Sequence, residues 1–206
     1  MHHKILLMGP QGCGKGTQAE RLSKKFNIPA FGTGQLIREE VAFGSEFGKK
    51  LNAIILRGEL ISDIDAAYLL KRRLEKPDAI NGYVLDGYPR NLSQLAAFDF
   101  DTPTHVIVID VPRAESLKRL SGRLTCRACN KIGSIHNGIK PGDTCECGGK
   151  WYQRDDDTQE AITRRLEIYE KDTSPVIAEY DKKGIVHHVD GMGSVEEVLG
   201  RILKIL

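Results

Sequence analysis

Residues 9–17, Gly-Pro-Gln-Gly-Cys-Gly-Lys-Gly-Thr, combine glycines, a lysine and a hydroxyl in a spacing suited to phosphate chemistry. An apolar run precedes them and a segment with helical apolar spacing follows, so we expect a strand-to-helix turn. Glycines let the backbone curl so that successive N–H groups point at an anion, and the helix adds the unpaired N–H groups of its first turn. Lys15 can reach the outer phosphates, and Thr17 is placed to bind Mg²⁺. The stretch predicts a phosphate-binding loop rather than an accidental glycine-rich turn.

Two acidic residues end apolar runs and could hold a metal-bound water beside that loop. Asp86 ends residues 82–86, and Asp110 ends residues 106–110. A carboxylate at the C-terminal end of a strand can position Mg²⁺ next to bound phosphates. We favour Asp86 because Arg90 follows it with a second phosphate-directed charge, and we interpret Asp110 as a turn or helix-start residue.

Four of the five cysteines lie close together in the sequence, between positions 126 and 147. Two thiolate pairs joined by a polar, glycine-containing loop can bind one Zn²⁺ tetrahedrally, and four protein ligands leave no position for a water. We therefore predict a structural zinc that contributes on the order of 10 kcal/mol to local folding. A redox dithiol is the alternative, but two pairs exceed what one exchange site needs. The predicted ligands are Cys126, Cys129, Cys145 and Cys147, with His136 as an alternative to one of the last two.

The elements that must position these groups alternate between strand and helix. The expected architecture is α/β, a five-stranded parallel sheet with ligands at the C-terminal ends of the strands. A helical excursion over residues 33–76 is longer than a crossover needs and predicts a small subdomain. Ser174 before Pro175 predicts a helix cap. The predicted strands are residues 4–8, 28–31, 83–86, 104–110 and 185–189, and the predicted helices include residues 16–26, 113–121, 158–171 and 195–206.

Composition limits the class of protein. The 206 residues are 40% hydrophobic and 28% charged with a formal net charge of +2, which is typical of a globular protein and gives no sign of nonspecific nucleic-acid binding. No apolar run approaches the roughly 20 residues that a membrane helix needs, and no apolar signal region precedes the first strand. We expect a cytoplasmic protein without membrane or nucleic-acid partners.

One arginine is predicted to lie at the buried side of its helix. Arg165 comes three residues after Ile162 and borders the apolar stripe of residues 158–171, whereas Arg164 points away from it. A half-buried guanidinium needs an anionic partner, and a phosphate would be one.

These motifs, and the order in which they follow one another along the chain, resemble those of adenylate kinases of the long-lid, zinc-containing bacterial type, within the nucleoside monophosphate kinase family. The resemblance covers essentially the whole chain. It implies a P-loop core formed by residues 1–31, 62–122 and 161–206, a helical AMP-binding subdomain at residues 32–61 and a zinc-stapled lid at residues 123–160. The motifs are the phosphate loop, Thr33-Gly-x-x-x-Arg38, Asp86-Gly-Tyr-Pro-Arg90 with Gln94, Gly122-Arg123, Arg154-x-Asp156-Asp157 and Arg165.

The resemblance implies the reaction MgATP + AMP ⇌ 2 ADP and a role for each matching residue. The cations at the transferring phosphoryl group would be Lys15, Arg38, Arg90, Arg123, Arg154 and Arg165. The ATP site would consist of Gly12, Cys13, Gly14, Lys15, Gly16, Thr17, Arg119, Arg123 and Gly193, with Asp86 holding Mg²⁺ through water. The AMP site would consist of Thr33, Arg38, Glu59, Leu60, Ile61, Gly87, Tyr88, Pro89, Arg90, Gln94, Arg154 and Arg165.

Two alternatives remain at this point. A related kinase could use UMP or CMP as acceptor, or GTP with AMP, although Thr33 and Gln94 favour adenine. A zinc-ribbon nucleic-acid-binding protein regulated by ATP is a rival from another class, and the near-neutral charge and the lack of aromatic residues among the basic segments argue against it. A bilobal kinase of this size has no evident need of a partner, so we expect a monomer.

Overall fold

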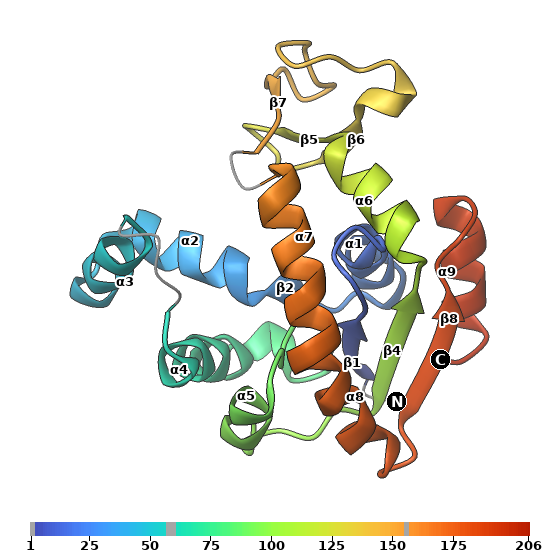
Figure 1. Ribbon diagram of the computed structural model, residues 1–206. Coiled ribbons are helices and arrows are strands. Elements are labelled where there is room, and N and C mark those ends of the chain that lie inside the picture. Colours follow the sequence, from blue (N-terminus) through green and yellow to red (C-terminus); the bar gives the residue numbers. More distant parts are fainter. Residues whose placement is uncertain (1–2, 57–60, 155–156) are drawn as a thin grey trace.

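The computed structural model describes residues 3–56, 61–154 and 157–206 and is organised around a five-stranded parallel sheet (Figure 1). The strand order is β2-β3-β1-β4-β8. This confirms the predicted α/β class with five parallel strands. The second strand begins two residues later than predicted, because Pro29 has no N–H to donate. The strands are β1 (His3–Met8), β2 (Ala30–Gly32), β3 (Gly82–Asp86), β4 (His105–Asp110) and β8 (Val186–Asp190).

Helices cover both faces of this sheet, which explains why the central strands β1, β3 and β4 contain continuous apolar runs rather than alternating ones. One face packs Ile5 and Ile107 against α1 (Lys15–Phe26) and α9 (Val195–Leu203). The opposite face packs Leu6 and Val106 against α4 (Asp63–Leu74) and α8 (Ser174–Asp181), with α5 (Leu92–Ala97) beside them. Because β1 pairs in parallel with β3 and β4, the C-terminal ends of these three strands lie along the same edge of the sheet.

Two helices leave the sheet after β2. They are α2 (Thr33–Phe43) and α3 (Glu46–Leu56), and both lie to one side of the core in Figure 1. A short 3₁₀ turn, η1 (Pro77–Ala79), separates α4 from β3. The helical excursion expected for residues 33–76 therefore forms three helices.

The helices that precede β8 form one continuous run. α7 (Gln159–Ile168) passes directly into the π-helical turn η3 (Tyr169–Thr173), which continues into α8. Ser174 has helical dihedral angles (φ −58°) and its hydroxyl lies 3.5 Å from the carbonyl oxygen of Tyr169. The prediction that Ser174 caps a new helix was wrong, because the preceding turn stays helical.

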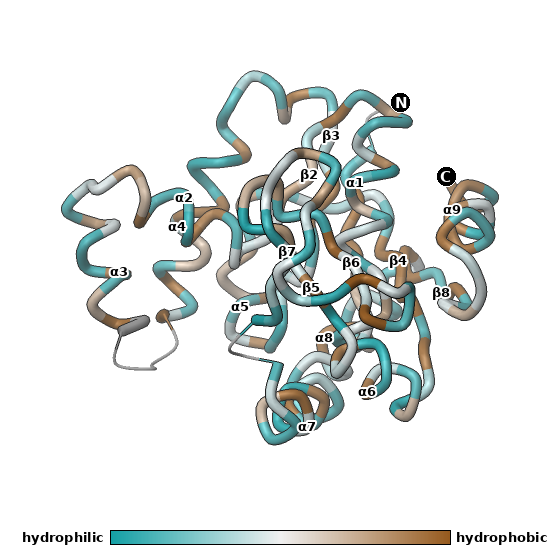
Figure 2. The backbone as a smooth tube through the Cα atoms, turned by 90° about the horizontal axis from the view of Figure 1, so that it is seen from above, coloured by the Kyte–Doolittle hydropathy of each residue, from teal (hydrophilic) through white to brown (hydrophobic). Residues whose placement is uncertain are grey.

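A second, small sheet lies beyond the ends of α6 (Arg113–Ser121) and α7 (Figure 1). It is antiparallel with the order β6-β5-β7, formed by β5 (Arg123–Cys126), β6 (Ile132–Ser134) and β7 (Trp151–Tyr152), and the 3₁₀ turn η2 (Ile135–Asn137) follows β6. Seen from above, it projects over the centre of the large sheet (Figure 2). Within the described residues, no helix has the length and apolar character that crossing a membrane requires.

Candidate active site

The phosphate loop connects β1 to α1 and depends on glycine at the positions where the chain turns most sharply. Gly9 and Gly14 have φ values of +135° and +98°. A Cβ atom on Gly9 would lie 2.5 Å from the carbonyl oxygen of Ile109, so a larger residue would collide with β4. Gly14 is the N-cap of α1 and provides no side-chain cap, which leaves the N–H groups of the first turn available to an anion.

Lys15 lies across this loop. Its Nζ donates hydrogen bonds to the carbonyl oxygens of Gly9 at 2.6 Å and Pro10 at 2.9 Å, and it lies 3.4 Å from Sγ of the buried Cys13. Among the residues that the structure describes, no carboxylate pairs with this ammonium group. Within the described part of the chain, the positive charge of the loop therefore has no carboxylate as counterion.

Asp86 lies beside the first turn of the helix that follows the loop. It ends β3, and its Oδ2 would lie 3.4 Å from a Cβ atom placed on Gly16, in the first turn of α1 next to Thr17. A carboxylate and a hydroxyl at this place fit Mg²⁺, which takes oxygen ligands. Asp110 has a different partner, since its Oδ2 lies 2.7 Å from Nδ1 of His188. Asp110 also lines a cavity with Pro10 of the loop, and the choice of Asp86 for Mg²⁺ stays a prediction.

The backbone after β3 is fixed by hydrogen bonds around Arg90. Its Nε donates to the carbonyl oxygen of Gly87 at 2.6 Å, and its backbone N–H donates to Oε1 of Gln94 at 2.8 Å. Tyr88 is fully buried and forms a cis peptide bond with Pro89. Although Arg90 has exposed surface, neighbouring atoms displace water from the guanidinium and lower its pKa; the Asp86 carboxylate opposes this shift and Arg165 adds to it. Arg90 therefore lies within electrostatic range of both residues.

Thr33 and Arg38 belong to α2, on the side of the sheet edge where that helix leaves it. Thr33 is buried at the start of α2, and Nη1 of Arg38 would lie 3.5 Å from a Cβ atom on Gly34, one turn earlier. No ion pair joins Arg38 to any residue in the described ranges. Ile61 packs against the adjoining core. Glu59 and Leu60, also predicted for the AMP site, lie outside the described residues.

Two arginines from different elements share the buried carboxylate of Asp157. Arg123 of β5 donates to it through Nε at 2.8 Å and Nη2 at 2.5 Å, and Arg165 of α7 donates through Nη2 at 2.8 Å. The carboxylate is 0% exposed. Arg165 thus has the anionic partner predicted from its helix position, and Arg164 is exposed as expected. The sequence motif contained Asp157, but nothing in its spacing identified it as the residue that joins the two arginines.

Arg154 lies next to the same cluster. Together with Gln153, Asp157 and Thr158 it lines a cavity of about 500 Å³. Its carbonyl oxygen accepts a hydrogen bond from the N–H of Asp157 at 3.1 Å. The structure therefore brings three of the predicted arginines, Arg123, Arg154 and Arg165, to the junction between the small sheet and α7.

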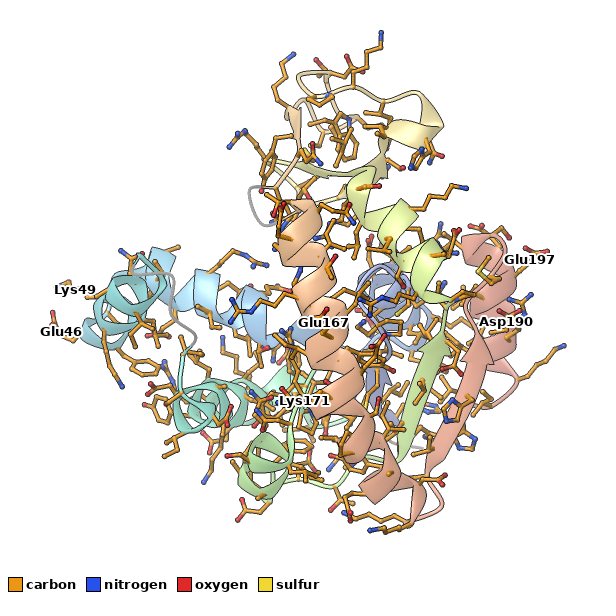
Figure 3. All side chains as sticks on the ribbon, in the orientation of Figure 1. Glu46, Lys49, Glu167, Lys171, Asp190 and Glu197 are labelled. Carbon is orange, nitrogen blue, oxygen red and sulfur yellow. The ribbon has the colours of Figure 1, made fainter. Side chains whose placement is uncertain are left out.

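Arg119 contacts the loop that contains Gly193. Arg119 donates to Glu115 Oε1 at 2.8 Å and to the carbonyl oxygen of Gly191 at 3.2 Å. Gly193 has a φ of +102° within the loop that joins β8 to α9. Asp190 and Glu197 flank this loop in Figure 3, and each carboxylate accepts a backbone N–H from it, that of Met192 and of Ser194 respectively. The contribution of Glu115 was not recognised from the sequence.

The four clustered thiols suit a single zinc ion. All four Sγ atoms lie within 4.8 Å of one another, with Cys126 and Cys147 separated by 3.5 Å and Cys129 and Cys145 by 3.9 Å. Tetrahedral Zn–S bonds of about 2.3 Å place sulfurs about 3.8 Å apart, so the donor set fits the ion. The alternative ligand His136 is not supported, because its Nε2 lies 3.2 Å from the carbonyl oxygen of Lys118, where the small sheet meets α6.

Ionisation of these thiols shows why a cation suits the cluster. Backbone N–H groups of Cys129 and Ala128 lower the pKa of Cys126 to about 6. The pKa of Cys129 is raised to about 12, even though the N–H of Lys131 favours its thiolate, because the other three sulfurs surround it. Ionisation of one thiol therefore makes ionisation of its neighbours less favourable, and a bound cation would offset the repulsion among four thiolates.

A glycine loop after the first strand of a parallel sheet, an acid at the end of the adjacent strand and arginines gathered above them define a P-loop kinase. The family model for adenylate kinase matches residues 7–185. Curated adenylate kinases from Methanothrix thermoacetophila, Thermodesulfovibrio yellowstonii and Archaeoglobus fulgidus are 42%, 41% and 41% identical to this chain; the alignments cover 98% of this chain in each case and 97%, 98% and 97% of theirs. The chain belongs to the adenylate kinase family. The predicted reaction, phosphoryl transfer from MgATP to AMP, is confirmed, and the rival acceptors and the nucleic-acid-binding alternative are not favoured.

Proposed function

We propose that ATP and AMP bind on opposite sides of the C-terminal edge of the large sheet. The ATP phosphates lie in the loop of residues 12–17, where backbone N–H groups and Lys15 neutralise them. Asp86 holds Mg²⁺ through water, and Thr17 contributes its hydroxyl. Arg119 and the backbone at Gly193 bind the adenosine part. The uncompensated charge of Lys15 supports this assignment.

AMP occupies the other side, between α2 and the segment that follows β3. Its phosphate binds Arg38 and Arg90, and its base contacts Thr33 and Gln94 together with the backbone of residues 59–61. The backbone of Gly87, Tyr88 and Pro89 lines this side of the AMP site. The hydrogen bond from Arg90 to the carbonyl oxygen of Gly87 holds this backbone in place. In this arrangement the AMP phosphate oxygen attacks the γ-phosphorus in line, and ADP leaves.

The observation that carries the mechanism is the shared carboxylate of Asp157. It already holds Arg123 and Arg165 in one place, and a carboxylate and a phosphoryl group accept the same bidentate donors. We propose that these two arginines transfer from Asp157 to the phosphoryl group when both nucleotides are bound, and that Arg154, which lines the same cavity, joins them there. Catalysis then consists of positioning and charge neutralisation, with no protein nucleophile.

Residues 123–160 form the lid over this site, and residues 32–61 form the AMP-binding subdomain. Zn²⁺, held by the four cysteines, stabilises the lid and takes no part in the reaction, because all of its ligands come from protein. The lid excludes water that would otherwise hydrolyse ATP, and its opening limits turnover. We propose that the protein acts as a monomer and needs neither nucleic acid nor a membrane.

Replacement of Lys15 tests the assignment of the phosphate loop. With Mg²⁺, ATP and AMP, we expect Lys15→Ala to lower kcat for ADP formation by about 10³-fold, since a phosphate-neutralising cation is lost. The melting temperature should change little, because Lys15 bonds only loop carbonyls. Lys24→Ala, on the exposed face of the same helix, is the control and should keep full activity. Near-native turnover of Lys15→Ala would show that the phosphates bind elsewhere.

A further inference from the structure

The amide of Gln94 has a fixed orientation, because each of its two ends bonds a group that cannot change its role. Oε1 accepts a hydrogen bond from the backbone N–H of Arg90 at 2.8 Å, and Nε2 donates one to Oδ1 of Asp63 at 2.8 Å. A backbone N–H can only donate and a carboxylate can only accept. If the amide were rotated by 180°, its NH₂ group would face the N–H of Arg90 and its oxygen would face the Asp63 carboxylate, so both hydrogen bonds would be lost.

Asp63 is directed at this place by the ends of two helices. It is the first residue of α4, and besides Gln94 it faces the side-chain amide of Asn91, the N-cap of α5, with Nδ2 3.4 Å from both carboxylate oxygens. Asn91 in turn accepts the backbone N–H of Gln94 at 2.7 Å through its Oδ1. Among the described residues no cation pairs with Asp63, whereas Lys50 pairs with Asp65, two residues further along α4. Within the described residues, the side chains that bond the Asp63 carboxylate are therefore both amides.

The hydrogen-bonding capacity that remains on Gln94 matches one type of base. A primary amide has two N–H donors and two acceptor lone pairs, so one of each is left after the bonds to Asp63 and Arg90. An adenine edge offers an acceptor at N1 next to a donor at N6, which complements a donor and an acceptor side by side. A guanine or hypoxanthine edge offers the reverse, a donor at N1 and an acceptor at O6, and would require the rotated amide.

We propose that Asp63 is a positioning residue that selects adenine over 6-oxopurines in the acceptor nucleotide by fixing the Gln94 amide. The proposal rests on the assignment of Gln94 to the AMP base. In this proposal Asp63, at the start of α4, does not touch the base. It acts through its hydrogen bond to Gln94 of α5.

The test compares AMP with IMP and GMP as phosphoryl acceptors, at saturating MgATP. For Asp63→Ala we expect the KM for AMP to rise about tenfold and the preference for AMP over IMP in kcat/KM to fall by at least that factor, with the KM for ATP unchanged. Asp63→Asn retains an acceptor oxygen and should restore most of the preference. Asp65→Ala removes the other acid in the same helical turn and should leave the preference unchanged.

Two further variants separate the possible failures. Asp63→Ser keeps a polar group at the start of α4 but is too short to reach Gln94, so it must reproduce the loss seen with alanine. If Gln94→Ala lowers the AMP preference while Asp63→Ala and Asp63→Ser leave it intact, the role of Asp63 is refuted and the base assignment stands. If Gln94→Ala leaves the preference intact, the assignment of Gln94 to the base fails. A fall in melting temperature with an unchanged preference would mark Asp63 as purely structural and overturn the proposal.

Discussion

Ile5, Leu6 and Leu7 in the large sheet are each 0% exposed and lie between layers of helices, whereas the small sheet buries mainly Leu124, Trp151 and two of its cysteines. The large sheet can be stabilised by apolar burial alone, at roughly 1.5–3 kcal/mol for each fully buried aliphatic side chain. The small sheet has too few such residues, and a group of four thiols takes the place of a core. The comparison indicates that the two sheets of this family member rely on different groups, the large sheet on apolar burial and the small sheet on a cluster of four thiols that suits a zinc ion.

The largest expected effect is the loss of the metal. Cys145→Ser, or removal of zinc with a chelator, should unfold the small sheet locally, because structural zinc contributes on the order of 10 kcal/mol. Hydrogen exchange measured by mass spectrometry should accelerate over residues 123–152 while β1 and β4 stay protected. Metal analysis should show that the fraction of zinc lost matches the fraction of molecules in which residues 123–152 lose protection.

The matched change in the large sheet is Ile107→Ala. It leaves a cavity in a fully buried layer and should lower the free energy of unfolding by about 3–4 kcal/mol, shifting the main thermal transition while zinc stays bound. If the cysteine variant lowered protection equally in β1 and β4, the two sheets would form one cooperative unit and the comparison would be wrong.

Asp157→Asn tests the contact that joins the two regions. The amide keeps the shape of the carboxylate but leaves Arg123 and Arg165 without their counter-charge, and their side chains are only 18% and 24% exposed. We expect about 1–3 kcal/mol less stability in urea unfolding without nucleotide, below the usual cost for a buried pair because water reaches both guanidinium groups. Added nucleotide should stabilise this variant more than the unmodified protein, since its phosphates replace the missing charge. Equal stabilisation would show that the two arginines do not reach the phosphates.

The smallest effect concerns the N-terminal ends of β1, β4 and β8. Burial lowers the pKa of His105, and the nearby rings of His187 and His3 add to the shift; Phe26 of α1 covers His3 on the same face. Because the unfolded chain binds the proton more readily, the stability contributed by neutral His105 is present above about pH 6.5 and is lost as the pH falls through the lowered pKa of the folded state. His105→Gln should therefore show a smaller drop in melting temperature between pH 7.5 and pH 5.5. The small sheet, which carries none of these histidines, should keep its hydrogen-exchange protection over the same range.

Much of the site could be predicted because its residues are close together in the sequence. The phosphate loop, Asp86 with Arg90, and the four cysteines are short motifs whose chemistry follows from spacing alone. The contacts of Asp157 and Asp63 could not be predicted, since each joins residues 8 to 34 positions apart through a particular pairing of helices and strands. Glu115 and Arg119 are four residues apart in one helix, so their spacing did carry a signal that the sequence analysis did not use. The same limit applies to Ser174, where a local capping signal was overridden by a helix that continues through a π turn.

The sequence by itself determined the α/β class, the parallel strands, the phosphate loop and the clustered thiols, because apolar periodicity and glycine placement act over a few residues. Only the tertiary structure decided that Asp110 pairs with His188, that His136 stays away from the cysteines, and that one carboxylate joins arginines from β5 and α7. The physical reason is that charged and polar side chains are selected by the partners they meet after the elements pack, and that packing brings together groups whose distance along the chain carries no signal.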